Sequence, residues 1–221
     1  LIENADLIIT KQPSFVGCIA INLAIKYHVT SLVEVVGNAQ DAYYNHSFKG
    51  KIVAPVAEIL TRQSVEKADY VIYVTEKYLQ TKYPTRRDSI GCSDVVIKTL
   101  SSSEFSQRLL RTASINVKKL KLLTLGAIDV TYKNQNIIIE AIAELKGLGY
   151  ELEYFLAGSG SKESLYDFAK EKGVEEQIHF LGTLRHEDIF SLIDSVDLYI
   201  QPSLLEGLQR ALIEAMGRGC P

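Results

Sequence analysis

Two glutamates in one loop-to-helix segment, Glu206 and Glu214, carry the strongest chemical signal in the sequence. Residues eight apart on a regular helix lie about 80° apart around the axis and about 12 Å along it, so they form no tight carboxylate dyad. Two roles along one elongated ligand fit better: main-chain N–H groups around Gly207 and Leu208 hold an anion, and Glu214 accepts hydrogen bonds from hydroxyl groups. The alternative is structural, with Glu206 complementing a helix dipole and Glu214 on the helix surface.

Three glycines at the ends of apolar runs provide further candidate contacts. Gly126 opens a turn that ends at Lys133, and a turn into a helix N-terminus suits a phosphate, to which a lysine adds positive charge. Gly158 and Gly182 likewise let the main chain approach a ligand closely. An ordinary tight turn, with a solvated lysine in the first case, is the alternative. The sequence has neither a complete dinucleotide-binding fingerprint nor a G-x-x-x-x-G-K-[ST] loop, which argues against nicotinamide and P-loop sites.

The candidate residues follow short apolar runs that are rich in β-branched residues and typical of strands. Seven such runs recur, at residues 7–10, 31–36, 70–75, 121–125, 152–156, 177–181 and 197–200. Segments with helical spacing separate them, most clearly at 134–148. This alternation predicts an α/β fold with parallel sheets and right-handed crossovers. Ligands of such sheets bind beyond the carboxyl ends of the strands, where the glycines and glutamates stand.

A change of composition between residues 84 and 118 divides the chain. It contains a serine-rich run and a polar helical stretch, and no strong strand is predicted there. We expect two incomplete α/β domains, 1–95 and 118–221, joined by a linker at 96–117, although an insertion within one domain would look the same. Because the chain opens with Leu1 and ends at Pro221 just after an expected helix, we expect an internal portion of a longer protein.

Composition excludes several classes of function. Twenty-four Lys and Arg residues against 27 Asp and Glu residues give a net charge of −3, so no basic field gathers nucleic acid. Cys18, Cys92 and Cys220 have no C-x-x-C spacing, which predicts neither disulfides nor a zinc site and favours a reducing cytosol. No apolar run approaches the roughly 20 residues that span a bilayer. His186 and His179 belong to no recognisable pattern and are expected to be structural or exposed.

Together these segments resemble the carboxyl-terminal domain of a GT-B glycosyltransferase of the large retaining family 4. The most specific match is the paired-glutamate motif of that family, here Pro202-Ser203-x-x-Glu206-Gly207-Leu208-x-x-Ala211-Leu212-x-Glu214-Ala215-Met216 followed by Gly219-x-Pro221. Supporting matches are Gly126 with Tyr132-Lys133, Gly158-x-Gly160, Phe180-Leu181-Gly182 and residues 197–200. The resemblance covers residues 118–221 strongly, whereas residues 1–95 are more loosely similar to the acceptor domain of the family.

The resemblance implies a nucleotide-sugar donor that is held mainly by residues 118–221. Lys133 and the amides of Gly207 and Leu208 would bind the diphosphate, Glu214 the ribose hydroxyls, and catalytic Glu206 would lie beside the transferred sugar. Gly126, Gly158 and Gly182 complete the implied donor site. No metal or other cofactor is expected, since lysine and main-chain dipoles neutralise the leaving diphosphate. The sequence departs from the usual pattern of this family at two places. It has no arginine at 127–131, and Gln209 stands where the family commonly has proline.

The implied reaction moves a sugar, with retention of configuration, to a glycan or lipid-linked acceptor in cell-surface polysaccharide synthesis. We expect it in the cytoplasm, at the inner face of the membrane, with peripheral membrane contact through segments outside this chain. On the acceptor side, Asp41, Asn45 and catalytic His46 stand in the loop expected after 31–36, where a solvated histidine is the alternative. Two other functions stay open: a nucleotide-sugar epimerase or phosphorylase of the same fold, and a non-catalytic nucleotide- or glycan-binding module.

Overall fold

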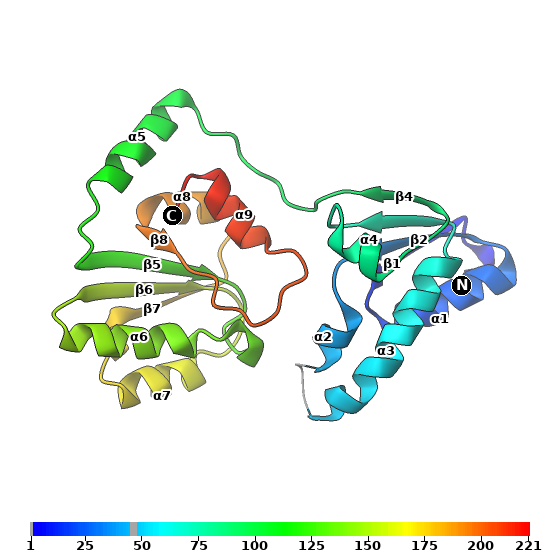
Figure 1. Ribbon diagram of the computed structural model, residues 1–221, viewed down its shortest axis with the longest axis horizontal. Helices are drawn as coiled ribbons and strands as arrows, with labels where there is room; N and C mark the ends of the chain where they lie inside the picture. Colours follow the sequence, from blue (N-terminus) through cyan, green and yellow to red (C-terminus); the bar gives the residue numbers. More distant parts are fainter. Residues whose placement is uncertain (1, 45–47) are drawn as a thin grey trace. The chain divides into compact units, whose positions relative to one another are not determined.

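The computed structural model describes residues 2–44 and 48–221, and it contains two compact units, each built on a four-stranded sheet (Figure 1). The first unit comprises Leu1–Asp94 with Leu205–Leu208, and the second comprises Val95–Leu204 with Gln209–Pro221. All paired strands in both sheets run parallel. The predicted α/β fold class with two Rossmann-like parallel sheets is therefore confirmed. None of the described helices has the length and apolar content that crossing a bilayer requires.

The sheet of the first unit has the strand order β1-β2-β3-β4. Its strands are β1 (Leu7–Gln12), β2 (Thr30–Val35), β3 (Tyr70–Tyr73) and β4 (Asp88–Gly91). The other elements are η1 (Ile2–Asn4), α1 (Phe15–Tyr27), α2 (Ala39–Tyr44), α3 (Phe48–Lys67) and α4 (Tyr78–Lys82). Alternate strand residues, such as Val33 and Val35 of β2, are buried in the core of this unit, because successive side chains of a strand point to opposite faces.

Two segments of the first unit differ from what the sequence predicts. Asp88–Gly91 forms the edge strand β4, yet all four of its residues are exposed, so it lacks the apolar alternation that would have announced it. The expected loop after β2 is instead the short helix α2, which contains Asp41. Asn38 stands just before α2, and its side-chain oxygen accepts from the Asp41 N–H at 3.5 Å. A polar side chain of this kind favours a helix start over a continued loop.

The sheet of the second unit has the strand order β7-β6-β5-β8. Its strands are β5 (Lys119–Leu125), β6 (Glu151–Ala157), β7 (Ile178–Gly182) and β8 (Leu198–Tyr199). Its helices are α5 (Ser102–Ala113), α6 (Asn136–Gly147), α7 (Glu163–Glu171), α8 (His186–Ser195) and α9 (Arg210–Gly217), with the short 3-10 turns η2 (Thr131–Lys133) and η3 (Glu175–Gln177).

The second sheet is covered on both faces, and strand alternation assigns each helix to a face. Leu122 of β5 packs into a cluster with residues of α6 and α7, such as Ile139 and Leu165. Its neighbour Leu123 packs into a separate cluster that includes Ile193 of α8. Figure 1 shows α6 and α7 on one side of this sheet and α8 and α9 on the other. The loops that carry the candidate residues therefore emerge at the carboxyl edge of a sheet that is buried on both faces.

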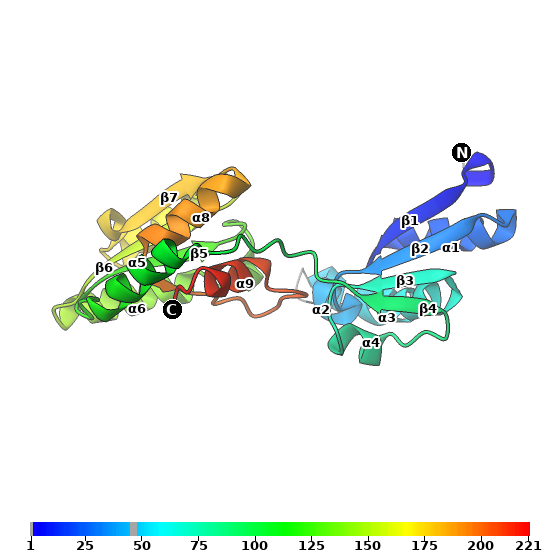
Figure 2. The ribbon, with the colours of Figure 1, turned by 90° about the horizontal axis from the view of Figure 1, so that it is seen from above.

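The segment 96–117, for which the sequence predicts a linker, contributes helix α5 to the second unit. Arg108 is 6% exposed, and its guanidinium donates to the main-chain oxygens of Ile193 (2.8 Å), Val196 (3.1 Å) and Arg218 (3.2 Å). Those oxygens lie at the ends of α8 and α9, where helices leave carbonyl groups without intrahelical donors. Figures 1 and 2 show α5 beside α8, as these bonds require.

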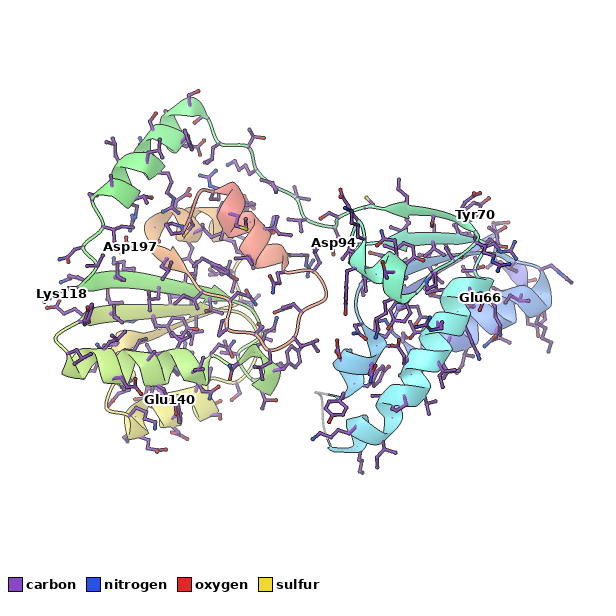
Figure 3. The ribbon with its side chains drawn as sticks, viewed as in Figure 1. Glu66, Tyr70, Asp94, Lys118, Glu140 and Asp197 are labelled. Atoms are coloured by element: carbon purple, nitrogen blue, oxygen red, sulfur yellow. The ribbon has the colours of Figure 1, made fainter. Side chains whose placement is uncertain are left out.

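Charged side chains attach the same helix further. Arg111 Nη2 donates to Asp197 Oδ1 at 2.9 Å, and Figure 3 labels Asp197 next to the start of β8. Arg218 Nη2 donates to Glu104 Oε1 at 3.1 Å. Glu104 also closes a capping box with Ser101 at the start of α5. The main-chain N–H and the hydroxyl of Ser101, followed by Arg218, lower the pKa of Glu104 to about 2, so this carboxylate is charged at neutral pH.

We predict that Arg108→Ala lowers the free energy of unfolding of the second unit by about 2–4 kcal/mol, because three buried carbonyl oxygens lose a charged donor. Differential scanning calorimetry of the full-length protein measures the change. Gln107→Ala removes an exposed side chain from the same helix and should change the stability by less than about 0.5 kcal/mol. Equal stabilities of the two variants would show that α5 is not an integral part of the unit.

Candidate functional site

The carboxyl ends of β5, β6 and β7 meet in a row of glycines. The Gly126 N–H donates to the Ala157 oxygen and the Gly158 N–H to the Gly182 oxygen, both at 2.9 Å. A Cβ atom on Gly158 would lie 1.8 Å from the carbonyl oxygen of Gly126, which only glycine avoids. Gly182 has a φ of 67°, a left-handed conformation that also favours glycine. The three glycines predicted from separate loops therefore lie side by side.

Lys133 ends the η2 turn, and its side chain returns to the glycine that opens the turn. A Cβ atom on Gly126 would lie 3.5 Å from Lys133 Cε and 3.7 Å from Nζ. Asn134, with a left-handed φ of 57°, then directs the chain toward α6. Buried Gln135 fixes the turn from within by donating its Nε2 to the Ala127 oxygen at 2.9 Å. The structure thus brings Gly126 and Lys133 together at the carboxyl edge, where a phosphate could approach both.

The loop after β8 begins against this same turn. The Leu204 N–H donates to the Tyr132 oxygen at 2.8 Å. Asn134 Nδ2 donates to the Pro202 oxygen at 3.4 Å. The first residues of the paired-glutamate segment are therefore tied to the residues on either side of Lys133, although 68 positions separate Asn134 from Pro202 in the chain.

Glu206, Gly207 and Leu208 lie on the loop that leads to α9. Glu206 and Leu208 are half-buried, whereas Gly207 is exposed. Helix α9 begins at Arg210, with Gln209 at its N-cap, so the N–H groups of Gly207 and Leu208 precede the helix instead of forming its first turn. The roles assigned to these three residues stay predictions.

Glu214 is the fifth residue of α9, and it is only 8% exposed. Its Oε1 atom lies 3.0 Å from Nε2 of His186, the first residue of α8. The His186 ring also contacts the edge of Phe190, with ring centroids 5.1 Å apart. The interpretation of Glu214 as a helix surface residue is therefore wrong, because the carboxylate is buried and paired. Nothing local in the sequence marks His186 as this partner, because 28 positions separate it from Glu214.

On the acceptor side, the structure describes only part of the predicted set. Asp41 is half-buried in α2, and its carboxylate accepts a hydrogen bond from Asn38 Nδ2. The same Nδ2 atom donates to the Tyr78 hydroxyl at 3.1 Å, so Asp41 belongs to a polar network within the first unit. Asn45 and His46 lie outside the described residues. The acceptor-side roles of all three residues stay predictions.

Other features of the second unit do not enlarge the candidate site. A cavity of about 880 Å³ lies between the start of α6 and helix α7, lined in part by Thr131, Gln135 and Ser161. Neither Lys133 nor Glu214 lines it, so we place the candidate site at the open carboxyl edge and not in this cavity. Over residues 2–44 and 48–221, no three His, Cys, Asp or Glu side chains are grouped so that they could hold a metal ion.

Two curated proteins are similar to this chain in sequence. The chain is 35% identical to Protein CapJ of Staphylococcus aureus over 222 residues, which cover all of this chain and 55% of CapJ. It is 33% identical to the putative glycosyltransferase EpsF of Bacillus subtilis (strain 168) over 90 residues, which cover 40% of this chain and 23% of EpsF. The chain therefore spans about half of CapJ and a smaller share of EpsF.

Solved structures agree in fold. Sucrose-phosphate synthase from Thermosynechococcus elongatus superimposes with a TM-score of 0.72 at 17% identity, over 98% of this chain and 55% of that protein. TarM superimposes with a TM-score of 0.68 at 17% identity, over 97% of this chain and 40% of TarM. Identities this low support the GT-B fold alone.

A family model settles the relationship. The model described as "Glycosyl transferases group 1" matches residues 106–221, more than half of the chain. This match includes the glycine row, Lys133 and both members of the paired-glutamate motif. The chain therefore belongs to the glycosyl transferases group 1 family, the retaining family 4 of GT-B glycosyltransferases.

Proposed function

We propose that the full-length protein transfers a sugar from a nucleotide-sugar to a glycan or lipid-linked acceptor, with retention of anomeric configuration, in cell-surface polysaccharide synthesis. One observation carries the proposal: the Lys133 side chain lies over Gly126 at the same sheet edge from which the loop to buried Glu214 departs. The proposal places the reaction in the cytoplasm, at the inner face of the membrane, with peripheral membrane contact through parts of the protein outside this chain.

Solved structures that share the fold contain ligands of the proposed class. A variant of TarM from S. aureus has been crystallised with UDP and alpha-GlcNAc-glycerol. The pneumococcal O-GlcNAc transferase GtfA has been crystallised with UDP and GlcNAc, and WaaG is described as a glycosyltransferase involved in lipopolysaccharide biosynthesis. These ligands share a nucleoside diphosphate and a sugar, which is the pairing that we propose for this protein.

In the proposed donor complex, the diphosphate lies at the glycine row. Lys133 supplies a positive charge, and the N–H groups near Gly207 and Leu208 supply dipoles. Glu214 accepts hydrogen bonds from the ribose hydroxyls, for which an ionised carboxylate is well suited because it only accepts. Gly126, Gly158 and Gly182 allow the ligand to approach the main chain without meeting a Cβ atom.

In the proposed reaction, the bond between the anomeric carbon and the diphosphate oxygen breaks first, and a short-lived oxocarbenium forms. The acceptor hydroxyl attacks from the same face, and its proton passes to the leaving diphosphate as the new glycosidic bond forms. Glu206 lies beside the anomeric centre and stabilises the developing positive charge. Asp41, Asn45 and His46 orient the acceptor hydroxyl through hydrogen bonds. The protein thus contributes positioning and charge stabilisation.

We predict that Lys133→Ala weakens the binding of a nucleoside diphosphate by about 1–3 kcal/mol, because one phosphate ion pair is lost. The binding of the bare nucleoside should hardly change, since it makes no phosphate contact. Isothermal titration calorimetry with UDP, GDP and ADP and the matching nucleosides measures both. Lys170→Ala, on the exposed surface of α7, controls for the general loss of one positive charge. Equal losses for diphosphate and nucleoside would contradict the phosphate assignment.

The two glutamates should separate in steady-state kinetics. Glu214→Ala is expected to raise the donor KM about tenfold with little change in kcat, because a ribose contact acts equally in the ground and transition states. Glu206→Ala is expected to lower kcat by about 10²- to 10³-fold, because its contact strengthens as the oxocarbenium forms. The reverse pattern would exchange the two roles.

The product formed from an α-linked nucleotide-sugar should itself be α-linked. Same-face departure and attack keep the configuration at the anomeric carbon, and proton NMR reads it before any anomerisation. A β-linked product would contradict both the mechanism and the stereochemistry of the family.

Release of nucleoside diphosphate only when acceptor is present would separate a transferase from a non-catalytic binding module.

A further inference from the structure

The contact between His186 and Glu214 joins helices α8 and α9, which follow β7 and β8, the two edge strands of the second sheet. His186 begins α8, four residues after β7 ends at Gly182. Glu214 lies one turn inside α9, the helix that follows β8. The two side chains meet at 3.0 Å even though they come from separate strand-to-helix crossovers. This arrangement places an imidazole directly on the carboxylate that we assign to the ribose.

The burial of the two partners is unequal, which indicates which of them needs the contact. The Glu214 side chain is 10% exposed, whereas the His186 side chain is 55% exposed. A carboxylate removed from water is destabilised unless donors replace its hydration. Among the described residues, His186 is the side chain that hydrogen-bonds to the Glu214 carboxylate. The exposed histidine, in contrast, buries little surface and contributes little to the core.

The charged neighbours of His186 are occupied with one another. Arg185 donates its Nε to Asp188 Oδ2 at 2.8 Å and its Nη2 to Asp188 Oδ1 at 3.1 Å. Arg185 Nη1 also lies 3.8 Å from Glu187 Oε1. His186 itself contacts Glu214 and, one helical turn further along α8, the ring of Phe190. The ring is therefore held on two sides, by a hydrogen bond and by an aromatic contact.

We propose that His186 is a positioning residue of the donor site, which fixes the Glu214 carboxylate for ribose recognition. A carboxylate only accepts hydrogen bonds, so Nε2 of His186 carries the proton and donates it to Oε1. The bond sets the plane of the carboxylate and directs Oε2 to the ribose hydroxyls. This inference rests on the proposed function, because it assumes that Glu214 binds the ribose of the donor.

The test compares ligands that differ only in the ribose hydroxyls. Isothermal titration calorimetry of the full-length protein uses UDP, GDP and ADP, each beside its 2′,3′-dideoxy analogue. His186→Ala is expected to raise the Kd of the natural diphosphate about 5- to 10-fold, in the range of one net hydrogen bond and no more than the loss expected for Glu214→Ala. The Kd of the dideoxy analogue should change less than about twofold, because it has no hydroxyl for Glu214 to accept from.

Two variants distinguish positioning from structural support. His186→Gln keeps an N–H donor for Oε1 and should restore affinity to within about threefold of the unsubstituted protein. His179→Ala removes the histidine of another histidine–glutamate pair in the same unit, with His179 Nε2 at 3.3 Å from Glu153 Oε1, and should leave the ratio of the two ligands unchanged. If His186→Ala unfolds the protein, His186→Gln is compared with His186→Asn, whose shorter side chain holds its amide too far from Oε1. The inference expects His186→Asn alone to lose affinity for the natural diphosphate and not for the dideoxy analogue. Equal ligand ratios in the two variants would overturn it.

The outcomes separate this inference from the function on which it rests. If Glu214→Ala reduces affinity only for the natural diphosphate while His186→Ala has no effect, the positioning role is overturned and the donor site stands. If Glu214→Ala does not discriminate between the two ligands, or if none of the three diphosphates binds, the ribose assignment itself is overturned. Equal losses for both ligands with His186→Ala would show a structural role and would also overturn the inference.

Discussion

The candidate site depends on the close approach of two main-chain segments, the turns after β5 and β6, which side chains would normally keep apart. A Cβ atom on Gly158 would lie only 1.8 Å from the carbonyl oxygen of Gly126. Because this contact brings the turns after β5 and β6 together, the Ile128 N–H can donate to the Ser159 oxygen at 2.9 Å. The turn that carries Lys133 is then held on one side by β6 and on the other by the loop after β8. The position of the lysine thus follows from the absence of a side chain.

A second dependence links the site to the helix that precedes the sheet. The helices that carry His186 and Glu214 end at carbonyl groups that accept from Arg108 of α5. A buried guanidinium is costly to desolvate, and its three main-chain acceptors offset that cost. Residues 102–113 therefore support the side of the second sheet on which α8 and α9 lie, although they precede its first strand. The two helices that carry His186 and Glu214 are therefore both attached to α5 through Arg108.

The parts of the fold that the sequence predicts are those with local physical signals. All seven apolar runs overlap strands, because burial on a parallel sheet demands continuous or alternating apolar residues. Strand β4 escaped prediction because its exposed residues carry no such pattern. Arg108 looked like part of a polar linker because its acceptors lie 85 to 110 positions away. The pairing of His186 with Glu214 was hidden for the same reason, whereas the turn from Gly126 to Lys133 was visible because it is short.

The lack of an arginine at residues 127–131 bears on how the proposed reaction divides its work. Two opposite unit charges about 4 Å apart attract by about 4 kcal/mol at an effective dielectric constant of 20, so each cation that is missing leaves the diphosphate less neutralised. A less neutralised diphosphate is a poorer leaving group, yet it is also more basic and accepts the acceptor proton more readily. In a same-face reaction the diphosphate performs both tasks, because it departs from the anomeric carbon and also accepts the proton of the acceptor hydroxyl. A site with few cations therefore relies more on stabilising the oxocarbenium and on holding the acceptor hydroxyl on the face from which the diphosphate departs, which assigns greater weight to carboxylates and to the residues that orient them.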